Sequence, residues 1–162
     1  MDLILWRHAE AEEIAPGIDD PHRGLTPRGL KQARRAADWL NRFLPAGARV
    51  ISSPALRCQQ TAAALERRVK LAEALAPEGG VEGLLAAARW PDSREPVLVV
   101  GHQPTLGLAA AYLMTGARLG QAPGADLLPW AIKKGSVWWL RHRPREERGE
   151  VVLVAVRTAE MM

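Results

Sequence analysis

Apolar and polar residues alternate along this chain with two different periods, one typical of helices and one of strands. In residues 27–44, leucine and alanine recur every three or four positions, which places them on one face of a helix. Thr26 is a favourable N-cap, Pro27 suits the first helical position, and Pro45 ends the segment. Further helices are expected over about 53–68, 81–90 and 104–114.

Short runs of branched and aromatic residues indicate buried β-strands. The expected strands are Leu3–Trp6, Val50–Ile51, Val97–Val100, Ser136–Leu140 and Val151–Val156. The charged stretch Arg141–Glu150 is expected to be the loop of a late hairpin, and 116–129 an irregular connection. Strands that alternate with helices predict the α/β class, as a single-domain three-layer α/β/α sandwich. Its sheet should be mainly parallel, with helices on both faces.

Length and composition are consistent with one domain over residues 1–162, because a chain of this size can bury a sizeable core. Cys58 is the single cysteine, so no intramolecular disulfide can form, which favours a reducing compartment. The N-terminus lacks the basic and apolar regions of a signal peptide. No stretch approaches the ~20 apolar residues of a membrane span. We therefore expect a cytoplasmic protein that makes no membrane contact.

The formal net charge is +4, and arginine outnumbers lysine. A basic balance can indicate a nucleic acid, a membrane surface or an anionic substrate as partner. Arginine is suited to bidentate contacts with phosphate. A general compositional bias, with abundant alanine, glycine and proline, explains the charge equally well.

Polar residues follow three of the expected strands, at the point where each strand ends. Arg7 and His8 follow the first strand, Ser52 and Ser53 the second, and His102 comes shortly after the third. In open α/β sheets, ligands bind beyond the carboxyl ends of the strands. The same edge of the sheet is therefore the expected place for a functional site.

The two histidines, His8 and His102, together with two arginines, indicate phosphate chemistry. Arg7 beside His8 favours an anion over a metal ion, and a neutral imidazole can attack phosphorus when the phosphate is held and neutralised. His102 precedes a helix whose free N–H groups favour an anion. Arg57 lies in the first turns of another helix. Together the four could clamp one phosphoryl group, although each histidine taken alone is more often a core or surface residue.

Other phosphate-handling and hydrolytic motifs are absent from the sequence. There is no Gly-x-x-x-x-Gly-Lys-Ser/Thr segment, so a P-loop nucleotidase is not indicated. A cysteine phosphatase needs arginine six positions after its cysteine, where this chain has Ala64. Cys58 is therefore expected to have no chemical role. Ser52 and Ser53 lack the glycine-flanked elbow of serine hydrolases and are expected to form a turn and an N-cap.

Four segments resemble, in order, the motifs of the histidine phosphatase superfamily, whose members are phosphoglycerate mutase-like. They are Arg7-His8-Ala9, Leu25-Thr26-Pro27-Arg28-Gly29, Ser52-Ser53-Pro54-Ala55-Leu56-Arg57 with Gln60-Thr61-Ala62, and Gly101-His102-Gln103-Pro104. The resemblance runs from residue 3 to about 115. The short chain and the Gly-His-x-Pro form are most similar to the SixA-type phosphohistidine phosphatases.

The resemblance implies a role for each matching residue. His8 would be the nucleophile that becomes phosphorylated, while Arg7, Arg57 and His102 would bind the transferring phosphoryl group. No metal ion and no organic cofactor are implied. Two positions depart from the family pattern, because Ala9 replaces a glycine and Gln103 replaces an acidic residue that donates a proton in many members.

A general acid is therefore missing from its usual place. Glu73, Glu78 and Glu82 occupy the stretch where other members have a glutamate, and Glu78, beside Gly79 and Gly80, is the best candidate. The alternative is a solvated loop carboxylate. A site without an acid remains adequate for phosphohistidine, which can leave as neutral imidazole.

The resulting hypothesis is a metal-independent phosphohydrolase that removes phosphoryl groups from phosphohistidine on proteins and releases inorganic phosphate. A histidine-containing phosphotransfer protein would be a substrate of this kind. One alternative is a small-molecule phosphomonoesterase of the same superfamily. A second is a phosphate- or nucleic-acid-binding protein without catalysis, which would use the arginines of the 141–148 stretch near Trp138 and Trp139. Neighbouring strand residues point to opposite faces, so the two tryptophans cannot form one stacking platform.

Overall fold

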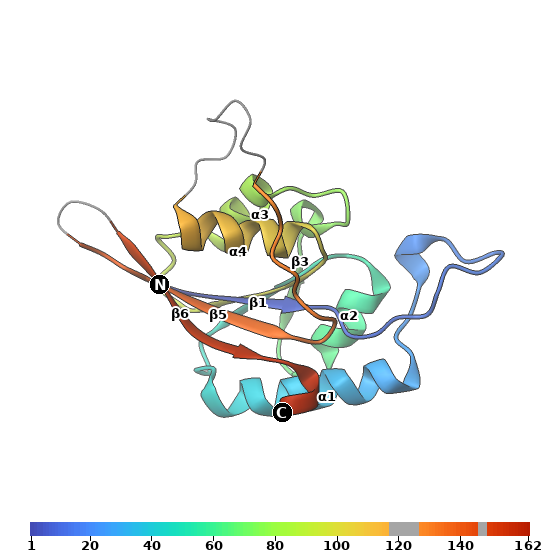
Figure 1. The fold of residues 1–162 in the computed structure, drawn as a ribbon. Helices are drawn as coiled ribbons and strands as arrows, with labels where there is room; N and C mark the ends of the chain where they lie inside the picture. Colours follow the sequence, from blue (N-terminus) through green and yellow to red (C-terminus); the bar gives the residue numbers. More distant parts are fainter. Residues whose placement is uncertain (117–126, 146–148) are drawn as a thin grey trace.

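The computed structural model describes residues 1–116, 127–145 and 149–162 (Figure 1). The strands are β1 (Asp2–Arg7), β2 (Arg49–Ser52), β3 (Val69–Leu71), β4 (Val97–Gly101), β5 (Val137–Arg143) and β6 (Glu150–Arg157). The α-helices are α1 (Pro27–Phe43), α2 (Leu56–Ala63), α3 (Val81–Ala88) and α4 (Thr105–Thr115). Short 3-10 turns are η1 (Asp20–His22), η2 (Glu73–Leu75) and η3 (Ala159–Met161).

The strands form one six-stranded sheet in the order β3-β2-β4-β1-β5-β6. The first four in this order pair in parallel, whereas β5 pairs antiparallel with β1 and with β6. Helices α3 and α4 lie on one face of the sheet, and α1 and α2 lie on the other (Figure 1). The predicted three-layer α/β sandwich with a mainly parallel sheet and a late hairpin is confirmed.

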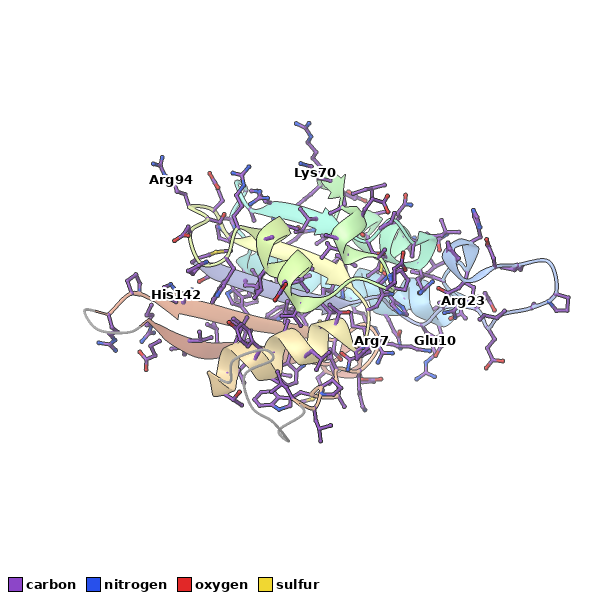
Figure 2. The ribbon with its side chains drawn as sticks, turned by 90° about the horizontal axis from the view of Figure 1, so that it is seen from above. Arg7, Glu10, Arg23, Lys70, Arg94 and His142 are labelled. Carbon is purple, nitrogen blue, oxygen red and sulfur yellow. The ribbon has the colours of Figure 1, made fainter. Side chains whose placement is uncertain are left out.

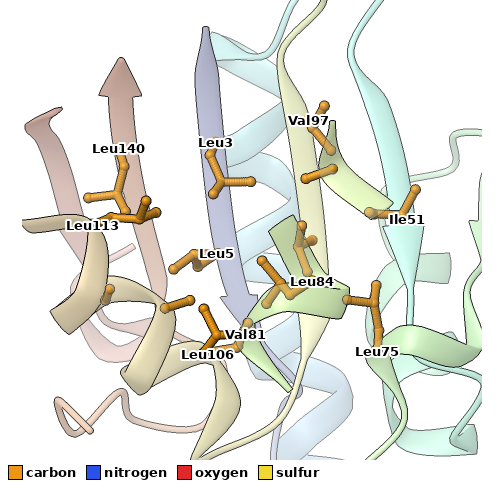
Figure 3. Close-up of a cluster of buried hydrophobic side chains, with 14 of the residues drawn as sticks. Leu3, Leu5, Ile51, Leu75, Val81, Leu84, Val97, Leu106, Leu113 and Leu140 are labelled. Atoms are coloured by element: carbon orange, nitrogen blue, oxygen red, sulfur yellow. The ribbon is translucent and has the colours of Figure 1, made fainter. Parts of the chain in front are cut away.

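Strand β1 shows how the sequence builds two cores from one sheet. Leu3 and Leu5 point to the side of α3 and α4, while Ile4 and Trp6 point to the side of α1 and α2. Figure 3 shows the first of these clusters, in which Leu5 lies near Leu106 of α4. Because side chains alternate across a strand, an unbroken apolar run is what a strand covered on both faces requires.

Helix α1 begins as predicted. The Thr26 side chain accepts a hydrogen bond from the Gly29 backbone N–H at 2.9 Å, and Pro27 is the first helical residue. Gly29 lies so close to the Glu10 backbone carbonyl that a Cβ atom there would collide with it. A glycine at this point therefore lets α1 pack directly against the segment that follows His8. Leu30, expected on the apolar face, is 48% exposed, and Ala36 is buried instead.

Two sequence-based boundaries were wrong. The helix expected over 53–68 is much shorter, because the chain leaves the helix after Ala63, adopts a positive φ at Glu66 and returns as the unpredicted strand β3 beside β2. Its N-cap is Ala55, without a side-chain hydrogen bond, so the predicted serine cap is also wrong.

The hairpin loop is also shorter than expected at its start. Strand β5 continues through Arg143, because Asp2 of β1 pairs with Arg141 in the sheet and binds its guanidinium at 2.6 Å. Most of the irregular connection expected over 116–129, and Arg148 of the hairpin loop, lie outside the described residues.

Candidate active site

The candidate site lies at the carboxyl ends of β1 and β4, where the sequence placed it. Arg7 is the last residue of β1, in register with Gly101 of β4, and the His8 backbone N–H donates to the Gly101 carbonyl at 3.1 Å. His8 and His102 therefore leave neighbouring strands side by side. In Figure 2, Glu10 and Arg23 lie toward the end of the molecule opposite to His142, and Arg7 lies between them and His142.

His8 is buried, and its imidazole is held in one tautomer. Its Nδ1 lies 2.8 Å from the Ala9 backbone carbonyl. A carbonyl can only accept, so Nδ1 has the proton and Nε2 has a free lone pair. The pKa of His8 is lowered to about 3, mainly by burial and also by the nearby His102, Arg57 and Arg7, whereas the hydrogen bond to Ala9 acts in the opposite direction. At neutral pH the imidazole is therefore uncharged, the form that can act as a nucleophile.

His102 faces His8, with 5.3 Å between the ring centroids. Its Nδ1 lies 3.4 Å from Arg57 Nη2, which can only donate, so Nε2 has the proton and donates to Ser53 Oγ at 2.8 Å. Burial lowers the pKa of His102 to about 4, and the charge of Arg57 acts in the same direction. The positive charge around the two rings therefore comes from arginine.

The two arginines predicted from the sequence have donors left over for a ligand. Arg7 donates from Nη1 to the Ile132 carbonyl at 2.7 Å, and Arg57 is 3% exposed. Within the described part of the chain, the Nε atoms of both side chains are buried and have no hydrogen-bond partner. Because buried donors are normally satisfied, two unpartnered guanidinium N–H groups beside two neutral imidazoles are suited to an anion.

Asp20 and Arg23 join this group, and sequence reasoning missed both. Arg57 donates from Nη1 to the Asp20 carbonyl oxygen at 2.8 Å and from Nη2 to its carboxylate at 3.0 Å. Arg23 binds the other carboxylate oxygen at 2.7 Å. Burial raises the pKa of Asp20, but the hydrogen bonds from Arg23 and Arg57 outweigh it and lower the pKa below 3.8. Asp20 is therefore an ionised carboxylate, and it accepts hydrogen bonds from Arg57, whose donors a phosphoryl group would need.

Helix α2 is attached to the loop after His8 through Thr61. The Ala9 backbone N–H donates to Thr61 Oγ1 at 3.0 Å, and the Thr61 hydroxyl donates to the Arg57 carbonyl at 2.7 Å. The threonine of the predicted motif thereby links the segments that present His8 and Arg57. Cys58 Sγ lies 3.5 Å from His102 Nε2, and burial raises the pKa of this thiol to about 12, so it is not a thiolate nucleophile.

Neither Gln103 nor Glu78, the best candidate for a general acid, places a carboxylic acid in contact with these groups. Gln103 Oε1 accepts from the Gly107 N–H at 2.9 Å, and its amide donates to the Trp130 carbonyl at 3.0 Å, so this side chain stabilises the start of α4. Glu78 is exposed. Its loop lies against α4, because Thr105 Oγ1 donates to the Gly79 carbonyl at 2.8 Å.

The basic stretch near the hairpin has ordinary structural contacts. Arg141 binds Asp2, and Arg145 binds Glu150 at 2.9 Å. Trp138 and Trp139 pack into the cores on opposite faces of the sheet, as expected. Within residues 1–116, 127–145 and 149–162, no three His, Cys, Asp or Glu side chains are grouped as a metal site would require. In the same residues, no helix has the length and apolar character needed to cross a membrane.

Comparisons with known proteins agree with the predicted family. The model of the histidine phosphatase superfamily (branch 1) matches residues 3–79. The uncharacterized protein Rv1276c of Mycobacterium tuberculosis is 38% identical over 112 residues, which are 66% of this chain and 68% of that protein. Phosphohistidine phosphatase SixA of Escherichia coli is 32% identical over 125 residues, or 72% of this chain and 76% of SixA.

A solved structure extends the similarity over almost the whole chain. The Nakamurella multipartitia protein assigned as a phosphohistidine phosphatase SixA superposes with a TM-score of 0.74 at 29% identity, covering 96% of this chain and 94% of that one. Fold, site geometry and sequence relatives therefore agree, and this chain belongs to the histidine phosphatase superfamily and is a phosphatase of its branch 1.

Proposed function

We propose that this phosphatase removes phosphoryl groups from phosphohistidine on proteins, through a phosphohistidine intermediate on His8. The observation that supports this most is the neutral His8 imidazole, with Nδ1–H held by the Ala9 carbonyl and His102 beside it. His8 Nε2 attacks phosphorus while the bond from phosphorus to the substrate nitrogen breaks. Arg7, Arg57 and His102 stabilise the oxygens of the transferring group. Water then cleaves the new phosphorus–nitrogen bond and releases inorganic phosphate.

The protonation of the site supports this substrate class. Asp20 is a carboxylate bonded to Arg57 and Arg23, and its lowered pKa leaves it without a proton to donate at neutral pH. A sugar or other alkyl phosphate leaves as an alkoxide, which needs a general acid. A phosphohistidine whose other ring nitrogen is protonated leaves as neutral imidazole. A protein phosphohistidine, as on a histidine-containing phosphotransfer protein, therefore suits this site.

A comparison of substrates tests the proposal. The protein is offered a phosphohistidine-carrying protein, an aryl phosphate and an alkyl phosphate, and kcat/KM is measured for each in the presence and absence of EDTA. We expect the phosphohistidine protein and the aryl ester to be hydrolysed far faster than the alkyl ester, with no loss in EDTA. An alkyl ester that is hydrolysed as well as phosphohistidine would refute the substrate class.

The intermediate has its own test. Rapid quenching during turnover should trap a label on the protein that acid removes and base does not, as a phosphorus–nitrogen bond requires. His8→Ala should lose both the label and turnover. His22→Ala is the matched control, because the His22 side chain is 77% exposed. An acid-stable label, or one that persists in His8→Ala, would show that another residue is the nucleophile.

The small-molecule phosphomonoesterase remains a second candidate because of the position of the Glu78 loop. The Gly79–Thr105 hydrogen bond holds this loop against the first turn of α4, three residues after His102. Glu78 would then be a general acid for ester substrates. Glu78→Gln should leave phosphohistidine hydrolysis nearly unchanged under the first proposal. If the substitution abolishes hydrolysis of alkyl esters that the wild type cleaves well, the second candidate is correct.

A further inference from the structure

The two edges of the sheet differ in how they are protected. Strand β3 forms one edge, has three residues and has Lys70 at its centre, which projects away from the sheet (Figure 2). Strand β6 forms the other edge and has eight residues, with Val151–Val156 uncharged between Glu150 and Arg157. Proteins usually shorten, charge or cover an edge strand, because its free N–H and C=O groups pair with other strands. Strand β3 is both short and charged at its centre, whereas β6 is neither.

No described strand pairs with the outer side of β6, which faces outward beyond β5 (Figure 1). Leu153 is 38% exposed and Val154 is 43% exposed. Val154 is the extra residue of a β-bulge, since Ala155 pairs with Trp139 and Leu153 with Leu140. A bulge twists an edge strand and is one of the devices that discourage pairing, but no charged side chain accompanies it between Glu150 and Arg157.

An apolar surface adjoins this edge on the side of α1. A hollow of about 380 Å³ is lined by Trp39, Phe43, Trp139, Arg141, Val154, Ala155 and Arg157. Phe43 is 58% exposed at the end of α1. The exposed apolar side chains therefore continue from the edge strand onto the neighbouring helix, as they do at protein–protein interfaces.

We propose that β6 pairs antiparallel with β6 of a second copy of this chain, which joins the two sheets across a two-fold axis. The charge pattern of the strand identifies the partner. When β6 is paired antiparallel with itself about an axis near Leu153 and Val154, Glu150 of each copy lies opposite Arg157 of the other. The uncharged residues between them then face one another. A two-fold interface requires this self-complementarity, because the same surface is used by both subunits.

This arrangement leaves the candidate active site open in each subunit. His8 follows β1, and β5 lies between β1 and β6, so the interface is about 10 Å from β1 across the sheet. Antiparallel pairing also directs the two sites to opposite ends of the joined sheet. Substitutions that disrupt the dimer should therefore change the assembly of the protein without changing turnover per chain.

The first test compares the two sheet edges. Sedimentation equilibrium should show a concentration-dependent dimer for the wild type. Val154→Lys should make the protein monomeric, because a lysine ammonium would be buried against its symmetry mate. The matched control is Leu71→Lys on β3, where the leucine is 48% exposed, and it should dimerise like the wild type. Thermal unfolding and turnover of each variant establish that it is folded.

The second test uses the charges at the ends of β6. In the dimer, residue 150 of each copy lies opposite residue 157 of the other, so there are two such pairs. Either Glu150→Arg or Arg157→Glu alone gives both pairs like charges, and we expect each substitution to raise the dimer Kd by about tenfold. The double variant with both charges reversed restores the opposite pairs and should regain the wild-type Kd. Within one chain, Glu150 contacts Arg145 and Arg157 contacts Trp39. Reversing both charges would not restore these contacts, so they cannot explain a recovery of the wild-type Kd.

Three outcomes would overturn the proposal: a wild type that stays monomeric at the highest concentrations reached, a Val154→Lys protein that dimerises normally, or a double reversal that fails to recover the affinity lost by the single changes. None of them would alter the phosphohistidine assay, because that assay measures turnover per chain.

Discussion

Burial of two neutral histidines should make the fold sensitive to mild acid. The pKa of His8 is lowered from 6.5 to about 3, and that of His102 from 6.5 to about 4, mainly by burial. Between the folded and unfolded pKa values, the unfolded chain binds more protons than the native one, so the free energy of unfolding falls as the pH falls. The stability that is complete above the unfolded pKa is therefore lost progressively below it.

The size of this loss follows from the pKa values. At about pH 5 both histidines are mainly neutral in the fold, whereas an unfolded histidine is mainly protonated. One pKa unit corresponds to about 1.4 kcal/mol, and a pH of about 5 is about 1.5 units below the pKa of an unfolded histidine. Each histidine therefore lowers the free energy of unfolding by about 2 kcal/mol. The two together give about 4 kcal/mol, a large part of the stability of a small domain. Carboxyl groups titrate mostly at lower pH and contribute little here.

Urea denaturation at about pH 7 and pH 5 measures the effect. The wild type should lose about 4 kcal/mol of unfolding free energy between the two conditions, and the double variant His8→Gln/His102→Gln should lose only a small fraction of that. His22→Gln, which replaces an exposed imidazole, should behave like the wild type. The reasoning is wrong if the double variant and the wild type lose the same free energy on acidification.

Substitutions at four positions extend the tests to other parts of the molecule. Arg57→Ala should reduce kcat by roughly 10²–10³ without unfolding the protein, and Arg57→Lys should recover only part of it, because lysine lacks the guanidinium fork. Asp20→Asn should lower the inhibition constant of inorganic phosphate by up to about fivefold, since it removes a carboxylate that competes for Arg57; a higher constant would mean that Asp20 orients this arginine. Thr61→Val should cost about 1–3 kcal/mol of unfolding free energy in urea, because the Ala9 N–H loses its acceptor. Leu98→Ala should cost about 2–5 kcal/mol in the same assay, and a smaller loss would show that the site collapses around the cavity.

Elements with a strong local pattern were predictable, and those set by distant contacts were not. The runs that became β1 and β4 are apolar throughout because both faces of those strands are covered. Strand β3 has only one buried neighbour, β2, and its Val-Lys-Leu sequence has no distinguishing period. Helical periodicity likewise gave no sign that α2 ends at Ala63, since the turn at Glu66 is imposed by the return of the chain to β2.

The same distinction applies to the candidate site. His8 and His102 follow strands, and Arg57 belongs to a motif of fixed spacing, so their proximity could be predicted because the carboxyl ends of parallel strands lie at one edge of the sheet. Asp20 and Arg23 belong to an irregular segment with no repeating pattern. Asp20 reaches Arg57 across 37 positions of sequence. An aspartate followed by proline predicts a local turn at best, and it cannot reveal which distant side chain that turn will meet.

The protonation of the site links its stability to its chemistry. An imidazole can attack phosphorus only while its ring nitrogen is unprotonated, and the burial that keeps His8 neutral is what makes the fold vulnerable to acid. Positive charge for the phosphoryl oxygens must then come from groups that stay charged when buried, which arginine does and histidine does not. Arg7 and Arg57 meet that requirement, and their unpartnered Nε groups remain to be satisfied by an anion. Replacing Arg57 with histidine should therefore weaken phosphate binding at neutral pH more than Arg57→Lys does, because a third buried imidazole there would itself be neutral.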